Sequence, residues 1–351
     1  MVRVALDAMG SDLGPPATVA GAAAVSLGDQ APEILLVGDE PTLAAELAQH
    51  SHEPSRIRLV HASDVCGMDD KPKDALDRKP DASVLVAARL VASGDADVLV
   101  SAGNTGGVTL ACARTFQRLP GVGRAALGAV FPTERRRGEK DDPFSLILDA
   151  GLTLEVSAED LVAFAVMGSA YAQRISKNPK PRVALLSIGS EAGKGPPSIV
   201  AAHEKLARLP GIEFIGNVEG MDIPRGTADV VVTSGFTGNI VLKMLEGVSD
   251  TVKRLARDAA DQSWRVKLGM LLLAPKLRRM REVTDWQQYG GVPLLGFDHL
   301  CIKAHGRSTA RAVRNALKVA TITARTDLVA AIREGLARVE TIRPSTPPAA
   351  A

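Results

Sequence analysis

Strand-like apolar runs that end in short glycine-rich loops constrain the fold of this chain more than any other feature. Four such runs lie at residues 2–6, 98–100, 183–186 and 230–232. Helical patterns separate them, and strands that alternate with helices are typical of βαβ units in a mostly parallel sheet. Ligands of open α/β sheets bind beyond the carboxyl ends of the strands, where backbone N–H groups hold anions. We therefore expect an α/β fold with one anion site assembled from distant segments.

The four loops supply the candidate residues of that site. These are Asp7, Gly10, Asn104, Thr105, Gly106, Lys194, Gly195, Gly235, Thr237, Gly238 and Asn239. The glycines permit close approach of the backbone to a ligand, and the amide and hydroxyl side chains can bind ligand oxygens. The same Asn and Thr side chains are also good helix N-caps, so the spacing alone leaves capping and ligand binding both open.

Lys194 is the only cationic side chain among these candidates. Its loop, residues 189–195, fails the GxxxxGK[ST] phosphate-loop pattern, because the glycines are too close and Gly195 replaces the Ser or Thr. A lysine that follows a strand can nevertheless hold phosphate or polarise a carbonyl oxygen. A solvated surface lysine is the alternative.

The composition fits an aliphatic α/β core and excludes other classes. Of the 351 residues, 46% are hydrophobic but only 3% are aromatic, which suits parallel strands covered by helices on both faces. A formal net charge of +2 argues against a nucleic-acid-binding protein. Cys66, Cys112 and Cys301 have neither paired nor metal-ligand spacing, so we expect core cysteines, a reducing cytoplasm and no metal.

The chain shows no interdomain linker and no internal repeat. We expect a single domain over residues 1–342, with two lobes around a cleft, and a disordered tail at residues 343–351. No signal-peptide pattern and no apolar stretch of about 18 residues occurs, which favours a cytoplasmic protein. A capping-box pattern from Ser157 to Asp160 predicts the start of a helix.

Six segments together resemble one known family. They read LDAMGSDLGP, SAGNTGG, LLSIGSEAGKG, FIGNVEGMDI, GFTGN and YGGVPLLG, and they are similar to the bacterial phosphate acyltransferases over about residues 2–320. The resemblance implies a three-layer α/β/α fold of the isocitrate/isopropylmalate dehydrogenase type. It also implies that a fatty acyl group moves from an acyl carrier protein thioester to inorganic phosphate, without a cofactor. The product would be acyl-phosphate for phospholipid synthesis.

The family uses the lysine of the third loop and the asparagine of the fourth, which points to Lys194 and Asn239 as catalytic residues here. A matching His-Gly pair adds His305 as a secondary candidate, although a lone histidine is more often structural. Phosphate is already an anion, so the enzyme must position it and stabilise the developing oxyanion. No serine or cysteine nucleophile is needed.

The chain departs from the family pattern at two places. Residues 150–153 lack the Gly-Ala-Asn that usually follows the residue matching Asp149, and Ser234 stands where the family has Asp. These departures keep two alternatives open: a phosphotransacetylase-like enzyme that uses acyl-CoA, and a catalytically silent regulator that binds acyl chains or carrier protein. A dehydrogenase would need metal-binding carboxylates and a nucleotide site, and neither is evident.

Residues 262–281 combine six basic residues with an apolar tip and contain no acidic residue. They predict a projecting helical hairpin at about residues 255–285. Its candidate contacts with an anionic membrane or a partner are Leu271, Leu272, Leu273, Arg278 and Arg279. A hairpin packed in a dimer core is the alternative. The resemblance implies a homodimer, peripheral membrane contact and a downstream membrane acyltransferase. The basic run at residues 135–137 suits an acidic carrier protein, and a solvated loop, favoured when the run is taken alone, is the alternative.

Overall fold

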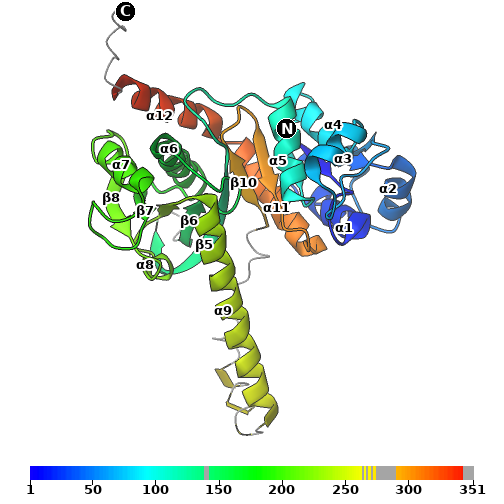
Figure 1. The fold of residues 1–351 in the computed structure, drawn as a ribbon. Helices are drawn as coiled ribbons and strands as arrows, with labels where there is room; N and C mark the ends of the chain where they lie inside the picture. Colours follow the sequence, from blue (N-terminus) through cyan, green and yellow to red (C-terminus); the bar gives the residue numbers. More distant parts are fainter. Residues whose placement is uncertain (138–141, 263–264, 266–267, 270–271, 274–289, 343–351) are drawn as a thin grey trace, which may run out of the picture.

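The computed structural model describes the chain except for residues 138–141, 263–264, 266–267, 270–271, 274–289 and 343–351. Within that part, eleven strands form one sheet in the order β3-β2-β1-β4-β11-β10-β5-β6-β9-β7-β8 (Figure 1). The strands are β1 Arg3–Asp7, β2 Glu33–Gly38, β3 Ile57–His61, β4 Val98–Ser101, β5 Ala126–Arg137, β6 Asp142–Leu148, β7 Arg182–Leu186, β8 Glu213–Val218, β9 Val230–Val232, β10 Val292–Leu295 and β11 Leu300–Lys303. The α-helices are α1 Gly14–Ser26, α2 Glu40–Leu47, α3 Pro72–Arg78, α4 Ser83–Ala92, α5 Thr105–Thr115, α6 Ala158–Ile175, α7 Pro197–Leu206, α8 Asp222–Arg225, α9 Gly235–Gln262, α11 Ala310–Ala324 and α12 Leu328–Ile342.

The sheet consists of two parallel groups joined by antiparallel strands. In one lobe β3, β2, β1, β4 and β11 run parallel, and in the other lobe β6, β9, β7 and β8 do so. Strands β10 and β5 lie between the lobes, and three antiparallel pairings connect the two groups. The two groups therefore run in opposite directions along the sheet. The right-handed twist of about 20–25° per strand pair rotates one group relative to the other.

Alternate residues of the central strands pack against opposite helical layers. Val4 and Leu6 of β1 contribute to one core with Val19 of α1 and Val313 of α11. The residue between them, Ala5, belongs to the core beneath α4 and α5. The second lobe alternates in the same way between a layer of α6, α7 and α12 and a layer of α8 and the first turns of α9. The expected three-layer, mostly parallel α/β/α fold is confirmed.

Helix α6 begins with the predicted capping box. The N–H of Asp160 donates to Ser157 Oγ at 3.1 Å, and the N–H of Ser157 donates to Asp160 Oδ2 at 3.0 Å. All three cysteines are buried, as expected for core residues.

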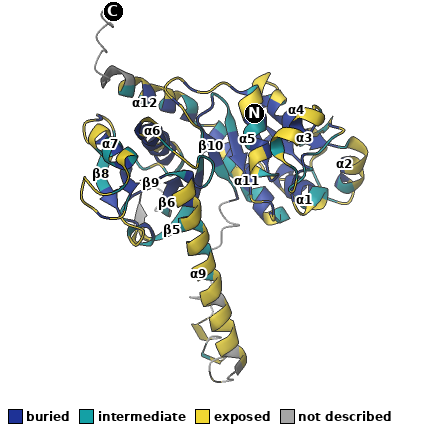
Figure 2. Cartoon of the chain, in the orientation of Figure 1, coloured by how far each residue is buried: buried dark blue, intermediate teal, exposed yellow. Residues whose placement is uncertain are grey.

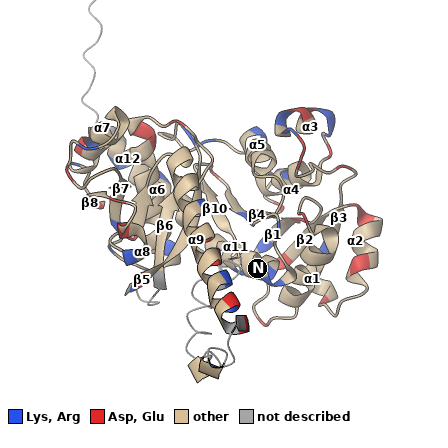
Figure 3. Ribbon diagram, turned by 60° about the horizontal axis from the view of Figure 1, so that its bottom comes forward, with Lys and Arg blue, Asp and Glu red and all other residues tan. Residues whose placement is uncertain are grey.

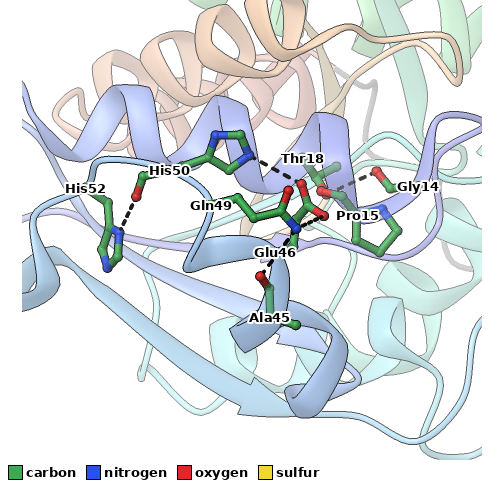
Figure 4. Close-up of polar contacts among 8 residues, drawn as sticks. All are labelled: Gly14, Pro15, Thr18, Ala45, Glu46, Gln49, His50 and His52. Atoms are coloured by element: carbon green, nitrogen blue, oxygen red, sulfur yellow. Dashed lines mark hydrogen bonds and ion pairs between the residues drawn. The ribbon is translucent and has the colours of Figure 1, made fainter.

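Thr18 ties the first glycine loop to α1. Its buried hydroxyl donates to the carbonyl of Ala8 at 2.7 Å. The same oxygen also lies 3.0 Å from the carbonyl oxygen of Pro15 (Figure 4). In the same view, His50 contacts Glu46 of α2 at 3.3 Å, and Nδ1 of His52 lies 2.9 Å from the carbonyl oxygen of His50. These contacts are local to α2 and the turn after it, so they give both histidines a structural role.

Helix α9 leaves the body of the molecule and is exposed along most of its length (Figures 1 and 2). Its exposed apolar side chains recur every three or four residues: Phe236, Ile240, Met244, Val248, Val252 and Leu255. Beyond it, Leu272 and Leu273 are helical, and 76% and 55% of their surface is exposed. Leu271, Arg278 and Arg279 lie outside the described residues, so the hairpin stays a prediction. No helix in the described part of the chain is long and apolar enough to cross a membrane.

Candidate active site

Asp7, at the carboxyl end of β1, organises the loops of the first lobe. Only 1% of its surface is exposed. Its carboxylate accepts hydrogen bonds from Ser83 Oγ at 2.7 Å, from Ser101 Oγ at 2.6 Å and from the N–H of Met9 at 3.3 Å. A Cβ atom on Gly10 would lie only 2.9 Å from Asp7 Oδ2 and 3.0 Å from the backbone of the loop after β4. The loops after β1 and β4 therefore touch, as the sequence predicts.

Asn104 caps helix α5. Its side-chain oxygen accepts the N–H of Gly107 at 3.1 Å, and its amide donates to the carbonyl of Met68 at 2.7 Å. Capping thus accounts for the Asn104 side chain in this structure. Thr105 and Gly106 are exposed in the first turn, where an α-helix leaves N–H groups without intrahelical partners. These two residues present the donors that an anion can use.

Lys303 is a buried cation that our sequence reasoning missed. Asp7, Ser101 and Lys303 occupy one register row across the neighbouring strands β1, β4 and β11. Only 6% of the Lys303 surface is exposed, and its ammonium donates to the carbonyl of Ala304. Burial lowers the pKa of Lys303 to about 8, and the nearby carboxylates of Asp7 and Asp12 oppose this shift. A single lysine inside an otherwise apolar strand is the signal that could have revealed it.

His305 follows β11 and lies near helix α9. Partial removal from water lowers its pKa, and the nearby cations Lys243 and Lys303 lower it further. Lys243 belongs to α9, so the second lobe contributes a helix to the end of β11. The carbonyl of Gly306 accepts the N–H of Asp12 at 2.9 Å, which joins this loop to the loop after β1. The structure thereby brings His305 together with the residues of the first lobe.

Lys194 is exposed on a loop whose backbone is held firmly. The hydroxyl of Ser187 donates to the carbonyl of Lys194 at 2.8 Å, and the N–H of Lys194 donates to the carbonyl of Glu191 at 3.0 Å. The next residue, Gly195, has a φ of +109°, a conformation that side chains other than glycine rarely adopt. The backbone is fixed, whereas the ammonium is open to a ligand.

The segment after β9 is also held through hydrogen bonds of its backbone. Ser234 Oγ accepts the N–H of Thr237 at 3.3 Å, so the serine that replaces the family's Asp caps the start of α9. The N–H of Gly235 donates to Thr153 O, and that of Gly238 donates to Ser234 O. Asn239 is exposed.

Asp149 holds the other loop that departs from the family pattern. Its fully buried carboxylate accepts the N–H groups of Leu127, Gly151, Leu152 and Thr153. Burial raises its pKa, and these hydrogen bonds oppose the rise. This loop contacts the start of α9, because a Cβ atom on Gly151 would lie 3.2 Å from the Asn239 side chain.

A cleft of about 350 Å³ lies between the loop of Lys194 and the loop of Asn239. Its lining residues are Leu154, Glu155, Val156, Leu186, Ser187, Ile188, Pro196, Ser198, Ile199, Thr233, Ser234 and Thr237. The loops after β7 and β9 therefore share one cavity. Among the described residues, no three His, Cys, Asp or Glu side chains are grouped to hold a metal ion.

Comparison of the chain with known proteins shows its family. A family model described as "Fatty acid synthesis protein" matches residues 2–331. A phosphate acyltransferase from Heliobacterium modesticaldum is 44% identical over 336 residues, which cover 95% of this chain and 97% of that one. A phosphotransacetylase from Streptococcus pyogenes shares the fold at 16% identity, with a TM-score of 0.61 and coverage of 92% and 94%. A 4-hydroxythreonine-4-phosphate dehydrogenase from Klebsiella pneumoniae also shares the fold, at 15% identity and a TM-score of 0.52. The match covers 92% of this chain and 99% of that one.

Fold and sequence together define an acyltransferase enzyme of the α/β class. The chain belongs to the phosphate acyltransferase family, because the identity to its members extends over nearly the whole length of both chains.

Proposed function

We propose that this enzyme transfers a fatty acyl group from an acyl carrier protein thioester to inorganic phosphate. The observation that carries the proposal is the cleft shared by the loops of Lys194 and Asn239, both of which expose their side chains. The relatives are named for phosphate as the acceptor, which agrees with a site that offers a cation and backbone donors. Lys194 and Asn239 are the catalytic residues of this proposal.

The proposed reaction needs no side-chain nucleophile. A phosphate oxygen attacks the carbonyl carbon of the thioester, a C–O bond forms, and the C–S bond breaks to release the carrier thiolate. The Lys194 ammonium and the Asn239 amide stabilise the oxyanion that develops on the carbonyl oxygen. The N–H groups of Thr105 and Gly106 hold the phosphate at the start of α5.

The remaining candidate residues position these groups. Asp7, Gly10 and Asn104 fix the loops of the first lobe, and the polar side chains of Asp7 and Asn104 are already engaged within the protein. Gly195, Gly235, Thr237 and Gly238 fix the loops of the second lobe, and His305 lies between the lobes. Burial and the neighbouring cations favour the neutral imidazole of His305. A neutral imidazole has one N–H group, which can donate a hydrogen bond to a phosphate oxygen.

One experiment separates this function from its alternatives. Purified protein is incubated with phosphate and with hexadecanoyl thioesters of acyl carrier protein or of CoA, and acyl-phosphate is detected by mass spectrometry. We expect product from the carrier thioester at the higher rate. Faster turnover of the CoA thioester would identify a phosphotransacetylase-like enzyme. Tight donor binding without any acyl-phosphate would identify a silent regulator.

We also propose a homodimer that contacts an anionic membrane. The apolar stripe of α9 is exposed at regular spacing, which supports packing against a second copy. Leu272 and Leu273 are exposed beyond it, within a segment rich in Lys and Arg, which supports an interface with anionic lipids. Charged residues appear on α9 only beyond its first turns (Figure 3). Membrane contact would deliver acyl-phosphate to a downstream membrane acyltransferase.

The acidic carrier protein needs a basic surface on its partner. Arg135, near the end of β5, is exposed and carries a charge that steers an acidic protein toward the enzyme. Steering of this kind weakens as salt is added.

A further inference from the structure

The cleft between the loops of Lys194 and Asn239 has more apolar surface than phosphate requires. Half of its lining residues are apolar: Leu154, Val156, Leu186, Ile188, Pro196 and Ile199. Leu186 and Ile199 are buried, whereas 64% of Leu154 and 82% of Ile188 are exposed. The apolar lining therefore extends from the core to the surface of the protein.

Large exposed apolar side chains beside a cavity need an explanation, because monomeric surfaces rarely group them without a function. Leu154 and Ile188 come from separate loops, after β6 and after β7, and yet both line the same cleft. The volume of about 350 Å³ lies in the usual range for sites of small organic ligands. A site of this kind holds an apolar ligand by burying its surface.

We propose that this cleft binds the hydrocarbon chain of the acyl donor, and that the extent of the apolar lining of the cleft selects the chain length. The inference rests on the proposed function, because only an acyl donor brings a hydrocarbon chain to this site. Two lining residues, Ser234 and Thr237, belong to the same loop as Asn239, and two others, Ser187 and Pro196, flank the loop of Lys194. Lys194 and Asn239 do not line the cleft themselves, but a chain held here has its carbonyl end close to the loops that carry them.

The polar arm of a carrier protein fits this cleft less well than a hydrocarbon chain. Its amides and hydroxyls would need hydrogen-bond partners, since burying an unpaired polar group is costly. Two of the polar lining residues are already engaged: Ser187 donates to Lys194 O, and Ser234 is bonded to Thr237. The six apolar residues that form the other half of the lining offer such an arm no hydrogen-bond partner, whereas they suit a hydrocarbon chain.

Chain-length profiles of two variants test the proposal. Ser198→Phe adds a ring to the wall of the cleft, and Leu154→Ala removes an exposed side chain without disturbing the core. Leu27→Ala is the matched control, because 58% of Leu27 is exposed and it lies in the first lobe, outside the cleft. For each protein, kcat/KM is measured with butanoyl, octanoyl and hexadecanoyl thioesters of acyl carrier protein.

We expect Ser198→Phe to lower kcat/KM for the hexadecanoyl donor at least about tenfold more than for the butanoyl donor. Leu154→Ala should lower the hexadecanoyl value about fivefold and the butanoyl value less than about twofold, because only the long chain reaches that wall. Leu27→Ala should match the native profile. Equal effects on all three donors in both cleft variants would overturn the proposal, since a site for the carrier arm does not respond to chain length.

The affinity of the cleft for acyl chains can also be measured without any catalytic reaction. Hexadecanoyl and butanoyl thioethers of CoA cannot transfer their chains, and their affinities are measured by calorimetry. We expect native protein to bind the hexadecanoyl thioether more tightly than the butanoyl thioether. In Leu154→Ala the ratio of the two affinities should fall about threefold or more. If native protein binds with this preference but forms no acyl-phosphate, the proposed function fails and the cleft assignment stands. If it forms acyl-phosphate without any preference, the cleft assignment fails.

Discussion

The two lobes hold their candidate residues in opposite ways. In the first lobe Asp7 and Lys303 are buried at neighbouring strand ends, and the Asp7 carboxylate accepts three hydrogen bonds. In the second lobe the Lys194 and Asn239 side chains are exposed, and hydrogen bonds fix the backbone of their loops. Among these four residues, the buried side chains of the first lobe are engaged within the protein, whereas the exposed side chains of the second lobe are accessible to a ligand. Buried Asp149 holds a loop of the second lobe in the same way as Asp7 holds loops of the first.

Removal of the Asp7 carboxylate should have the largest effect, and on stability. Asp7→Ala deprives Ser83 and Ser101 of their acceptor and leaves the buried Lys303 without its nearby anion. We expect the free energy of unfolding to fall by about 3 kcal/mol or more in denaturant titrations. Asp29→Ala, at an exposed position, should change it by less than about 0.5 kcal/mol. Similar losses in both variants would contradict a special role of the buried Asp7 carboxylate in holding the first lobe.

Removal of the Lys194 ammonium should instead affect activity alone. Lys194→Ala should lower acyl-phosphate formation by at least about 100-fold, as the loss of a preorganised oxyanion donor typically does. Asn239→Ala should act similarly and leave donor binding measurable. Both variants should keep native stability, because both side chains are exposed. Lys73→Ala, an exposed lysine of the first lobe, is the control. Near-normal activity of a folded Lys194→Ala protein would exclude this lysine from the mechanism.

The buried Lys303 of the first lobe differs from the exposed Lys194 of the second lobe, and its burial should make the stability of the protein depend on pH. The pKa of Lys303 is about 8 in the folded protein and 10.5 ordinarily. Burial of the charged ammonium therefore lowers the free energy of unfolding by its full amount below pH 8. As the pH rises from about 8 to 10.5, the unfolded chain binds more protons than the folded one, and this cost disappears. The unfolding constant of native protein, relative to Lys303→Met, should therefore fall at least about tenfold over that window. Parallel pH profiles of the two proteins would contradict the burial of a charged lysine.

The smallest effect concerns the exposed leucines beyond α9. Leu272→Glu should weaken binding to vesicles that contain anionic lipid by about fivefold, because it replaces an apolar contact with a negative charge. Binding of native protein should also fall as salt is added. Liposome co-sedimentation measures both effects. If vesicle binding stayed the same while a dimer became a monomer, the segment would be an assembly element.

The parallel strands and their loops could be predicted from the sequence because the information is local. An apolar run followed by glycine defines the end of a parallel strand, and β9 spans the three residues expected while β1, β4 and β7 lie within one residue of expectation. The antiparallel strands β5, β6 and β10 were not predicted. β5 contains Pro132 and ends in Glu and Arg side chains, so it lacks the pattern of a buried strand.

The relation between the lobes depends on tertiary structure and could not be predicted. The four glycine loops follow strands of two groups that run in opposite directions, and only the pairing of β10, β5 and β6 reveals this. Lys303 was missed because a lone lysine usually indicates a solvated position. The hydrogen bond from the N–H of Leu127 to Asp149 was missed for another reason, because 22 positions separate the two residues in the sequence.

The central claim is that inorganic phosphate, and not water, accepts the acyl group of the donor. The most direct test incubates purified protein with isotopically labelled phosphate and the hexadecanoyl thioester of acyl carrier protein. Mass spectrometry then follows the label in the products. We predict hexadecanoyl-phosphate that retains every labelled oxygen and forms at the rate at which carrier thiol appears. Release of thiol with unlabelled fatty acid as the only acyl product would contradict the account.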